Sequence, residues 1–225
     1  MRLTFIRHGE PAWTVDGRSI DDPYLTERGE HQVELLARHL ADLSCDEVLV
    51  SPLVRAQQTA APLLEILGLE GATTPWLAEI AAPPWEGAPE DQVIRAFAEG
   101  RARPVEEQWD GIPGGESFRD FHVRVTTGLT DMLAERGTRP AGPGSPLWEV
   151  DAPGLHVVMV AHAGTNAVAI GHLLGIYPVP WEWERFVMRH SSVSELSPYD
   201  TAGSCAFSLL RLNDVGHLSS ELETR

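Results

Sequence analysis

The sequence predicts an α/β protein, in which a sheet of strands is covered by helices on both faces. Short apolar runs at residues 3–6 and 155–161 are typical of buried strands, because aliphatic and β-branched side chains favour extended backbone. Between such runs, apolar residues recur every three or four positions, as they do along one face of a helix. Strands that alternate with amphipathic helices predict a layered α/β sheet.

The first half of the chain continues from its first strand into a loop at 11–25 that is rich in turn residues. Thr26 is predicted to cap a helix, and a second short strand is predicted at 47–50. Residues 51–52 (Ser-Pro) then indicate the start of another helix. We expect Pro62 to divide that helix, since an interior proline costs about 3 kcal/mol.

The middle of the chain is expected to begin with a third strand at 73–77. Prolines punctuate residues 81–115, where only a short helix at 90–100 is predicted. A longer helix follows from Ser117, with apolar residues at intervals of three or four.

The last part of the chain holds a fourth strand at 155–161, a helix at about 164–174 and two strands between 191 and 212. The Pro- and Gly-rich stretch at 137–154 is expected to be a solvent loop rather than a domain linker. The sequence has no internal repeat, and 225 residues suffice for one sizeable domain. We therefore expect residues 1–225 to form a single domain.

The composition limits the classes of partner and the compartment. A formal net charge of −16 argues against nucleic acid and anionic membranes as general partners. No signal peptide is recognisable, and no apolar run approaches the roughly 20 residues of a membrane span. Cys45 and Cys205 are far apart and are expected to be buried free thiols, which implies a reducing compartment. We therefore expect a cytoplasmic protein.

Polar side chains follow the predicted strands at the points where they end. Residues 7–10 (Arg-His-Gly-Glu) follow the first strand, Arg55 the second, Glu79 the third and His162 the fourth. Ligands of open α/β sheets bind just outside the carboxyl ends of the strands. A lone His-Gly pair is more often a turn with a surface histidine. Together, however, these residues supply a nucleophile, two guanidinium groups, an acid and a second imidazole, which suits the handling of phosphate.

Five segments in this order resemble the signature of the histidine phosphatase superfamily, the phosphoglycerate mutase-like proteins. They are residues 7–10, 51–60, 77–79 with 85–87, 114–117, and the segment around His162. The resemblance covers most of the chain and points to the phosphatase branch. It implies a three-layer α/β/α fold whose mostly parallel six-stranded sheet has one antiparallel member.

Phosphoryl transfer without a metal requires a nucleophile, neutralisation of the phosphoryl oxygens and protonation of the leaving oxygen. His8 can attack through a neutral nitrogen and form a phosphohistidine, while Arg7 and Arg55 offer planar forks that match phosphate. The resemblance implies that His162 hydrogen-bonds the transferring group and that Glu79 donates the proton and then activates water.

The residues alone leave the acid open, because Glu86 or Glu90 could serve in place of Glu79. The sequence also departs from the family pattern. Ala82 and Pro83 stand where the family has an aromatic residue and a glycine, so this loop is expected to be stiffer. Thr14 replaces an asparagine and can still donate one hydroxyl to phosphate.

The resemblance implies a histidine acid phosphatase-type phosphomonoesterase that acts on a small phosphorylated substrate and needs no cofactor. No metal is expected, because the other seven histidines have no ligand spacing; one of them, His190, is a candidate to approach the site. A mutase or phosphotransferase with the same site, or a non-catalytic phosphate-binding module, remains an alternative, although pure binding does not need His8 and Glu79. A homodimer also stays open.

Overall fold

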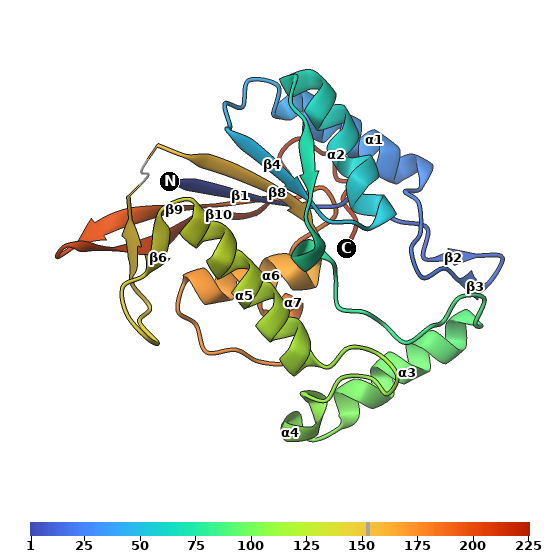
Figure 1. The fold of residues 1–225 in the computed structure, drawn as a ribbon. Coiled ribbons are helices and arrows are strands. Elements are labelled where there is room, and N and C mark those ends of the chain that lie inside the picture. Colours follow the sequence, from blue (N-terminus) through green and yellow to red (C-terminus); the bar gives the residue numbers. More distant parts are fainter. Residues whose placement is uncertain (152–153) are drawn as a thin grey trace.

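A computed structural model describes residues 1–151 and 154–225 of the protein (Figure 1). Its main sheet contains eight strands among the described residues, in the order β5-β4-β8-β1-β9-β10-β7-β6. These strands are β1 Arg2–Arg7, β4 Glu47–Val50, β5 Gly71–Thr73, β6 Thr138–Pro140, β7 Trp148–Val150, β8 His156–Ala161, β9 Val193–Thr201 and β10 Ser204–Asp214. A separate hairpin joins β2 Thr14–Val15 and β3 Arg18–Ser19.

The pairing within the sheet changes at β1. Strands β5, β4, β8 and β1 pair in parallel, whereas each pair from β1 through β9, β10 and β7 to β6 is antiparallel. The expected six-stranded sheet is therefore wrong in its count, because the expected loop at 137–154 contributes β6 and β7. These short strands join the sheet where Trp148 is buried in edge-to-face contact with Phe207, at 5.7 Å between ring centroids.

Helices cover both faces of the sheet, as predicted (Figure 1). The described helices are α1 Glu27–His39, α2 Val54–Leu67, α3 Glu90–Ala102, α4 Val105–Gln108, α5 Phe118–Glu135, α6 Ala163–Leu173 and α7 Glu182–Arg185, with a 3₁₀ helix η1 at Pro75–Leu77. Of these, α3 and α4 lie apart from the main sheet (Figure 1). Alternate strand residues face opposite sides. Ile6 and Val158 thus belong to the core under α1 and α2, while Phe5 and Val157 belong to the core under α5 and α6. The three-layer arrangement is confirmed.

A predicted cap and a predicted helix start are confirmed, and two details of α2 are wrong. The hydroxyls of Thr26 and Ser117 accept hydrogen bonds from the amides of their own first helical turns, in α1 and α5. Helix α2, however, begins at Val54 and not at Ser51, whose hydroxyl is engaged elsewhere. Pro62 lies inside α2 without dividing it. The apolar stripe that α2 buries against the sheet compensates for the amide that proline lacks.

Two further predictions are changed by the structure. The strand expected at 73–77 ends at Thr73, and η1 follows, because Pro75 cannot donate to a ladder. Cys45 and Cys205 are free thiols, as predicted, but they are half-buried rather than buried. Among the described residues, no helix is long and apolar enough to cross a membrane.

Candidate active site

Two histidines meet where neighbouring parallel strands end. β1 pairs with β8 in a register that places Arg7 beside Ala161, so the next residues, His8 and His162, lie side by side. Their ring centroids are 5.1 Å apart, and both side chains are buried. The ring of His190, just before β9, lies 5.5 Å from that of His8. The strand order therefore gathers three imidazoles at one edge of the sheet.

The ring of His8 is held in one tautomer. Its Nδ1 lies 2.7 Å from the backbone carbonyl of Gly9, and because a carbonyl only accepts, Nδ1 carries the proton. The lone pair of a neutral His8 is therefore on Nε2. Burial lowers the pKa of His8 well below its usual value, and electrostatic repulsion from the neighbouring His162, Arg7 and Arg55 lowers it further. His8 is thus a neutral imidazole with a free nucleophilic nitrogen at physiological pH.

Two buried guanidinium groups lie beside this imidazole. Arg7 bonds the carbonyl of Met188 and the Nε2 atom of His190, the latter at 2.9 Å. Arg55 lies 3.3 Å from Asp22, and its guanidinium covers the ring of Trp13 at 4.7 Å. Burial lowers the pKa of Arg7 to about 10, so this group still carries its charge at neutral pH.

Both arginines keep an unused donor. Within the described chain, the Nε atoms of Arg7 and Arg55 are buried and have no hydrogen-bond partner. Buried donors are nearly always paired in folded proteins, with protein, water or ligand. An anion with several acceptor oxygens, such as a phosphoryl group, would supply the missing partners. This local positive charge contrasts with the formal net charge of −16 of the chain.

The second imidazole has one tethered nitrogen and one unused nitrogen. The Nε2 atom of His162 lies 2.7 Å from the hydroxyl of Ser51. Its Nδ1 atom is buried and has no partner among the described residues. Burial, followed by the charges of nearby arginines, lowers the pKa of His162 well below its usual value. His162 is also the residue that precedes α6, whose first amides favour anions.

Glu79 lies in the loop after η1, and its side chain reaches the first turn of α6. Its carboxylate accepts hydrogen bonds from the amide of Gly164, at 2.9 Å, and from its neighbour Ile80, at 3.0 Å. Its charge opposes the effect of burial, which lowers the pKa of Arg7 and of Arg55. The acid thus lies at the start of α6, within electrostatic reach of both guanidinium groups.

The other candidates lie elsewhere. The hydroxyl of Thr14 donates to Glu90 at 3.3 Å, between the β2–β3 hairpin and α3. Glu86 accepts from the amide of Asp21 at 2.9 Å. In the described part of the chain, no hydrogen bond or ion pair joins these three side chains to the histidine cluster. The geometry therefore favours Glu79 over the two alternative acids, and phosphate binding by Thr14 stays a prediction.

Two residues of the cluster carried little or no functional signal in the sequence. Ser51 reads as a helix cap, yet its hydroxyl contacts His162. His190 accepts from Arg7 through Nε2, so its Nδ1 carries the proton and donates to the hydroxyl of Thr224 at 2.8 Å. Burial lowers the pKa of His190 to about 2. Only its place before a strand suggested that His190 could approach the site.

This fold, with imidazoles and unpaired guanidinium donors at the strand ends, defines a class of proteins that handle phosphoryl groups. The sequence model of the histidine phosphatase superfamily (branch 1) matches residues 3–214. The chain belongs to this family. Membership indicates a phosphatase or mutase activity, and it confirms the resemblance seen in the sequence.

Relatives with both activities are similar to the chain. Phosphoserine phosphatase 1 of Hydrogenobacter thermophilus is 34% identical over 135 residues, which cover 59% of this chain and 64% of that protein. A probable phosphoglycerate mutase of Enterobacter sp. (strain 638) is 27% identical over 228 residues, or 98% of this chain and 96% of that one. Among solved structures, a mycobacterial glucosyl-3-phosphoglycerate phosphatase aligns with a TM-score of 0.71 at 27% identity, covering 94% of this chain and 98% of that one. The α-ribazole phosphatase of Shigella flexneri aligns with a TM-score of 0.71 at 26% identity, covering 96% and 97%.

The buried neutral histidines should make the protein less stable in acid. The pKa values of His8, His162 and His190 are lowered on folding, so below about pH 6.5 the unfolded chain binds more protons than the native state. The free energy of unfolding should then fall by about 1.4 kcal/mol per pH unit for each such histidine. Denaturant titrations at pH 7, 6 and 5 would measure this slope.

Two variants test whether the pH dependence of stability comes from the buried histidines. His190→Asn removes one buried imidazole and should reduce the proton uptake on unfolding by close to one, which flattens the slope. His31→Asn, at an exposed position on α1, should leave the slope unchanged. A stability that does not change between pH 7 and pH 5 would contradict the neutral state of these histidines.

Proposed function

We propose that the protein is a metal-independent phosphomonoesterase that hydrolyses a phosphorylated small molecule through a phosphohistidine on His8. The observation that carries this proposal is the free Nε2 of His8 beside the unpaired donors of Arg7 and Arg55. A neutral nucleophile next to two fixed guanidinium groups supplies attack and charge neutralisation without further groups.

The first step transfers the phosphoryl group to the enzyme. The Nε2 lone pair of His8 attacks phosphorus while the bond from phosphorus to the leaving oxygen breaks. Arg7, Arg55 and His162 bind the phosphoryl oxygens during this transfer. The protonated carboxyl of Glu79 gives its proton to the leaving oxygen. The products are a phosphohistidine, a free alcohol and an ionised Glu79.

The second step returns the enzyme to its starting state. The carboxylate of Glu79 takes a proton from a water molecule as the water oxygen attacks phosphorus. The bond from phosphorus to Nε2 breaks, and its electron pair returns to His8. Inorganic phosphate leaves, and both His8 and Glu79 regain their initial protonation states.

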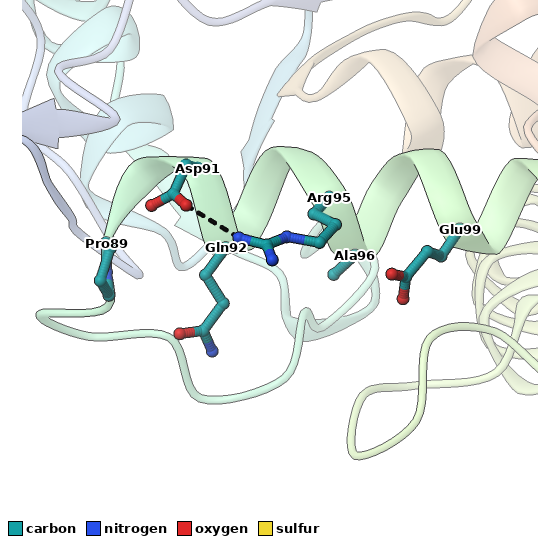
Figure 2. A pocket seen from close by; sticks show the side chains of 6 residues that line it. All are labelled: Pro89, Asp91, Gln92, Arg95, Ala96 and Glu99. Atoms are coloured by element: carbon teal, nitrogen blue, oxygen red, sulfur yellow. Dashed lines mark hydrogen bonds and ion pairs between the residues drawn. The ribbon is translucent and has the colours of Figure 1, made fainter.

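Water is the acceptor that the site favours. A mutase must hold a second anionic group of its substrate while the phosphoenzyme is kept from water. The segment at 80–85 after the acid carries no cation. The next cation, Arg95, bonds Asp91 at 2.8 Å on the surface of α3, beside an open hollow of about 420 Å³ (Figure 2). None of the strand-end residues lines this hollow.

Phosphatase and mutase activities are separated by one measurement. With 3-phosphoglycerate, stoichiometric enzyme and a trace of the 2,3-bisphosphate, we expect inorganic phosphate to account for nearly all substrate consumed. Phosphorus NMR follows substrate, isomer and phosphate together. Conversion to 2-phosphoglycerate faster than phosphate release would overturn the phosphatase proposal in favour of a mutase, the activity named for the Enterobacter relative.

The proposal also covers the partners of the protein and its cellular compartment. We expect a small phosphorylated metabolite as the substrate, and the formal net charge of −16 disfavours nucleic acid and anionic membranes. The two free thiols suit a reducing compartment, so we place the enzyme in the cytoplasm. A screen of phosphorylated metabolites with phosphate release as the readout would identify the leaving group.

A further inference from the structure

One arginine donates hydrogen bonds to several backbone carbonyls in the segment that leads to the candidate acid. Arg124 projects from α5, and its Nη1 atom donates to the carbonyls of Trp76, at 3.0 Å, and Ala78, at 3.1 Å. Its Nη2 atom donates to the carbonyl of Glu79 itself, at 3.3 Å. One guanidinium thus holds three backbone carbonyls of the segment that ends in the acid.

A glutamate completes this arrangement on the C-terminal side of the acid. Glu116 accepts two hydrogen bonds from Arg124, at 2.9 and 2.8 Å, in a bidentate pair. The same carboxylate accepts from the amide of Ala81 at 3.1 Å, and the amide of Glu116 donates to the carbonyl of Ala81 at 2.8 Å. The pair is therefore bonded to the chain on both sides of Glu79.

Two glycines allow the close approach that these bonds require. A Cβ atom on Gly115 would lie 2.7 Å from the carbonyl oxygen of Ala81, and one on Gly128 would lie 2.2 Å from the ring of Trp76. Both distances are shorter than a side chain tolerates. The Gly-Gly-Glu-Ser segment at 114–117, which the phosphoryl chemistry does not use, thus has a structural purpose at the acid loop.

We propose that Arg124 and Glu116 are positioning residues that hold the carboxyl of Glu79 at the leaving oxygen. This inference rests on the proposed role of Glu79 as general acid. Proton donation requires a hydrogen bond of defined length, and a misplacement of about 1 Å can cost about 10²-fold in rate. Lysine cannot replace the arginine, because its ammonium has three donors on one atom and cannot form the planar fork.

The test compares leaving groups that do and do not need a proton. We expect Arg124→Lys to lower kcat/KM, which reports phosphorylation of His8, by about 10- to 10²-fold for an alkyl phosphate. For 4-nitrophenyl phosphate, whose leaving group is stable as an anion, the loss should be less than about threefold. Glu116→Gln, which gives up one oxygen acceptor but keeps its size, should show the same pattern. Circular dichroism and a thermal melt would show that each variant is folded.

A matched control lies at the C-terminal end of the same helix. Arg136, just after α5, forms another bidentate pair with Glu47 at the amino end of β4, on the edge of the sheet away from the strand-end site. Arg136→Lys and Glu47→Gln make the same chemical changes in a pair that does not touch the acid loop. We expect these variants to retain the wild-type ratio of kcat/KM values for the two substrates.

Glu79→Gln separates failure of this inference from failure of the proposed mechanism. It should lose about 10²–10⁴-fold on the alkyl phosphate and far less on the nitrophenyl ester, and adding Arg124→Lys to it should cost little more. If Glu79→Gln behaves in this way while Arg124→Lys shows equal losses on both substrates, or none, the positioning role is wrong. If Glu79→Gln itself shows equal losses, the acid role fails and the positioning role falls with it.

Discussion

Replacing His8 by asparagine should lower kcat/KM for every phosphomonoester by about 10⁴-fold or more, the scale on which loss of a catalytic nucleophile is felt. Asparagine keeps a polar group near the backbone but offers no basic nitrogen to phosphorus. The effect should not depend on the leaving group, since the variant cannot form the covalent intermediate at all. This independence separates it from Glu79→Gln, whose loss depends on the leaving group.

Rapid-quench labelling measures the same prediction directly. Wild-type enzyme mixed with a labelled phosphomonoester should carry an acid-labile, base-stable phosphate on His8, and His8→Asn should carry none. His31→Asn, at an exposed site on α1, is the control and should label like the wild type. A phosphate on another side chain, or no adduct in the wild type on the millisecond scale, would contradict the covalent mechanism.

The sequence predicted the part of the site that depends on strand ends. His162 directly follows a buried apolar run, and His8 follows another after Arg7; parallel neighbours in register end at the same edge of the sheet. Their meeting therefore needs only the correct pairing of two strands. The local signals for Thr26 as a helix cap and for a helix that follows from Ser117 are equally short-range, and both were correct.

The features that the sequence did not predict depend on contacts between distant segments. Ser51 carries the local signal of a helix cap, but its hydroxyl bonds His162, which lies 111 positions away. Strand β7, which contains Trp148, is three residues long, too short for a recognisable alternation of apolar and polar residues in the sequence. It is held in the sheet by packing, including the contact of Trp148 with Phe207. Short elements of this kind are set by packing rather than by propensity.

The identity of the general acid also could not be predicted from local sequence. Residue type alone could not separate Glu79 from Glu86 and Glu90, because all three are glutamates that follow the predicted third strand. Two contacts distinguish Glu79 from the other two. Among the three, only Glu79 accepts a hydrogen bond from the amide of Gly164, and Arg124 donates to the backbone carbonyl of Glu79. Neither relation has a local pattern in the sequence.

Replacing Arg7 by methionine should lower kcat/KM by about 10³–10⁵-fold, the range found for arginines that stabilise a transferring phosphoryl group. Methionine keeps much of the side-chain length but removes the charge and every donor. The bonds to Met188 and His190 would also be lost, although these hold the guanidinium rather than the substrate. Arg7→Lys should retain part of the charge effect and fall between methionine and the wild type, because an ammonium cannot form the planar fork.

Ligand-dependent stability shows whether this loss comes from the anion site. Inorganic phosphate binds the native state and should raise the wild-type melting temperature by mass action. Arg7→Met should lose most of that rise, since the positive charge of Arg7 and its unpaired Nε donor, which phosphate would find in the site, are gone. Arg38→Met, on the exposed face of α1, should keep both the activity and the phosphate-induced rise. An Arg7→Met protein that is inactive yet stabilised by phosphate as fully as the wild type would show that Arg7 does not bind the phosphoryl group.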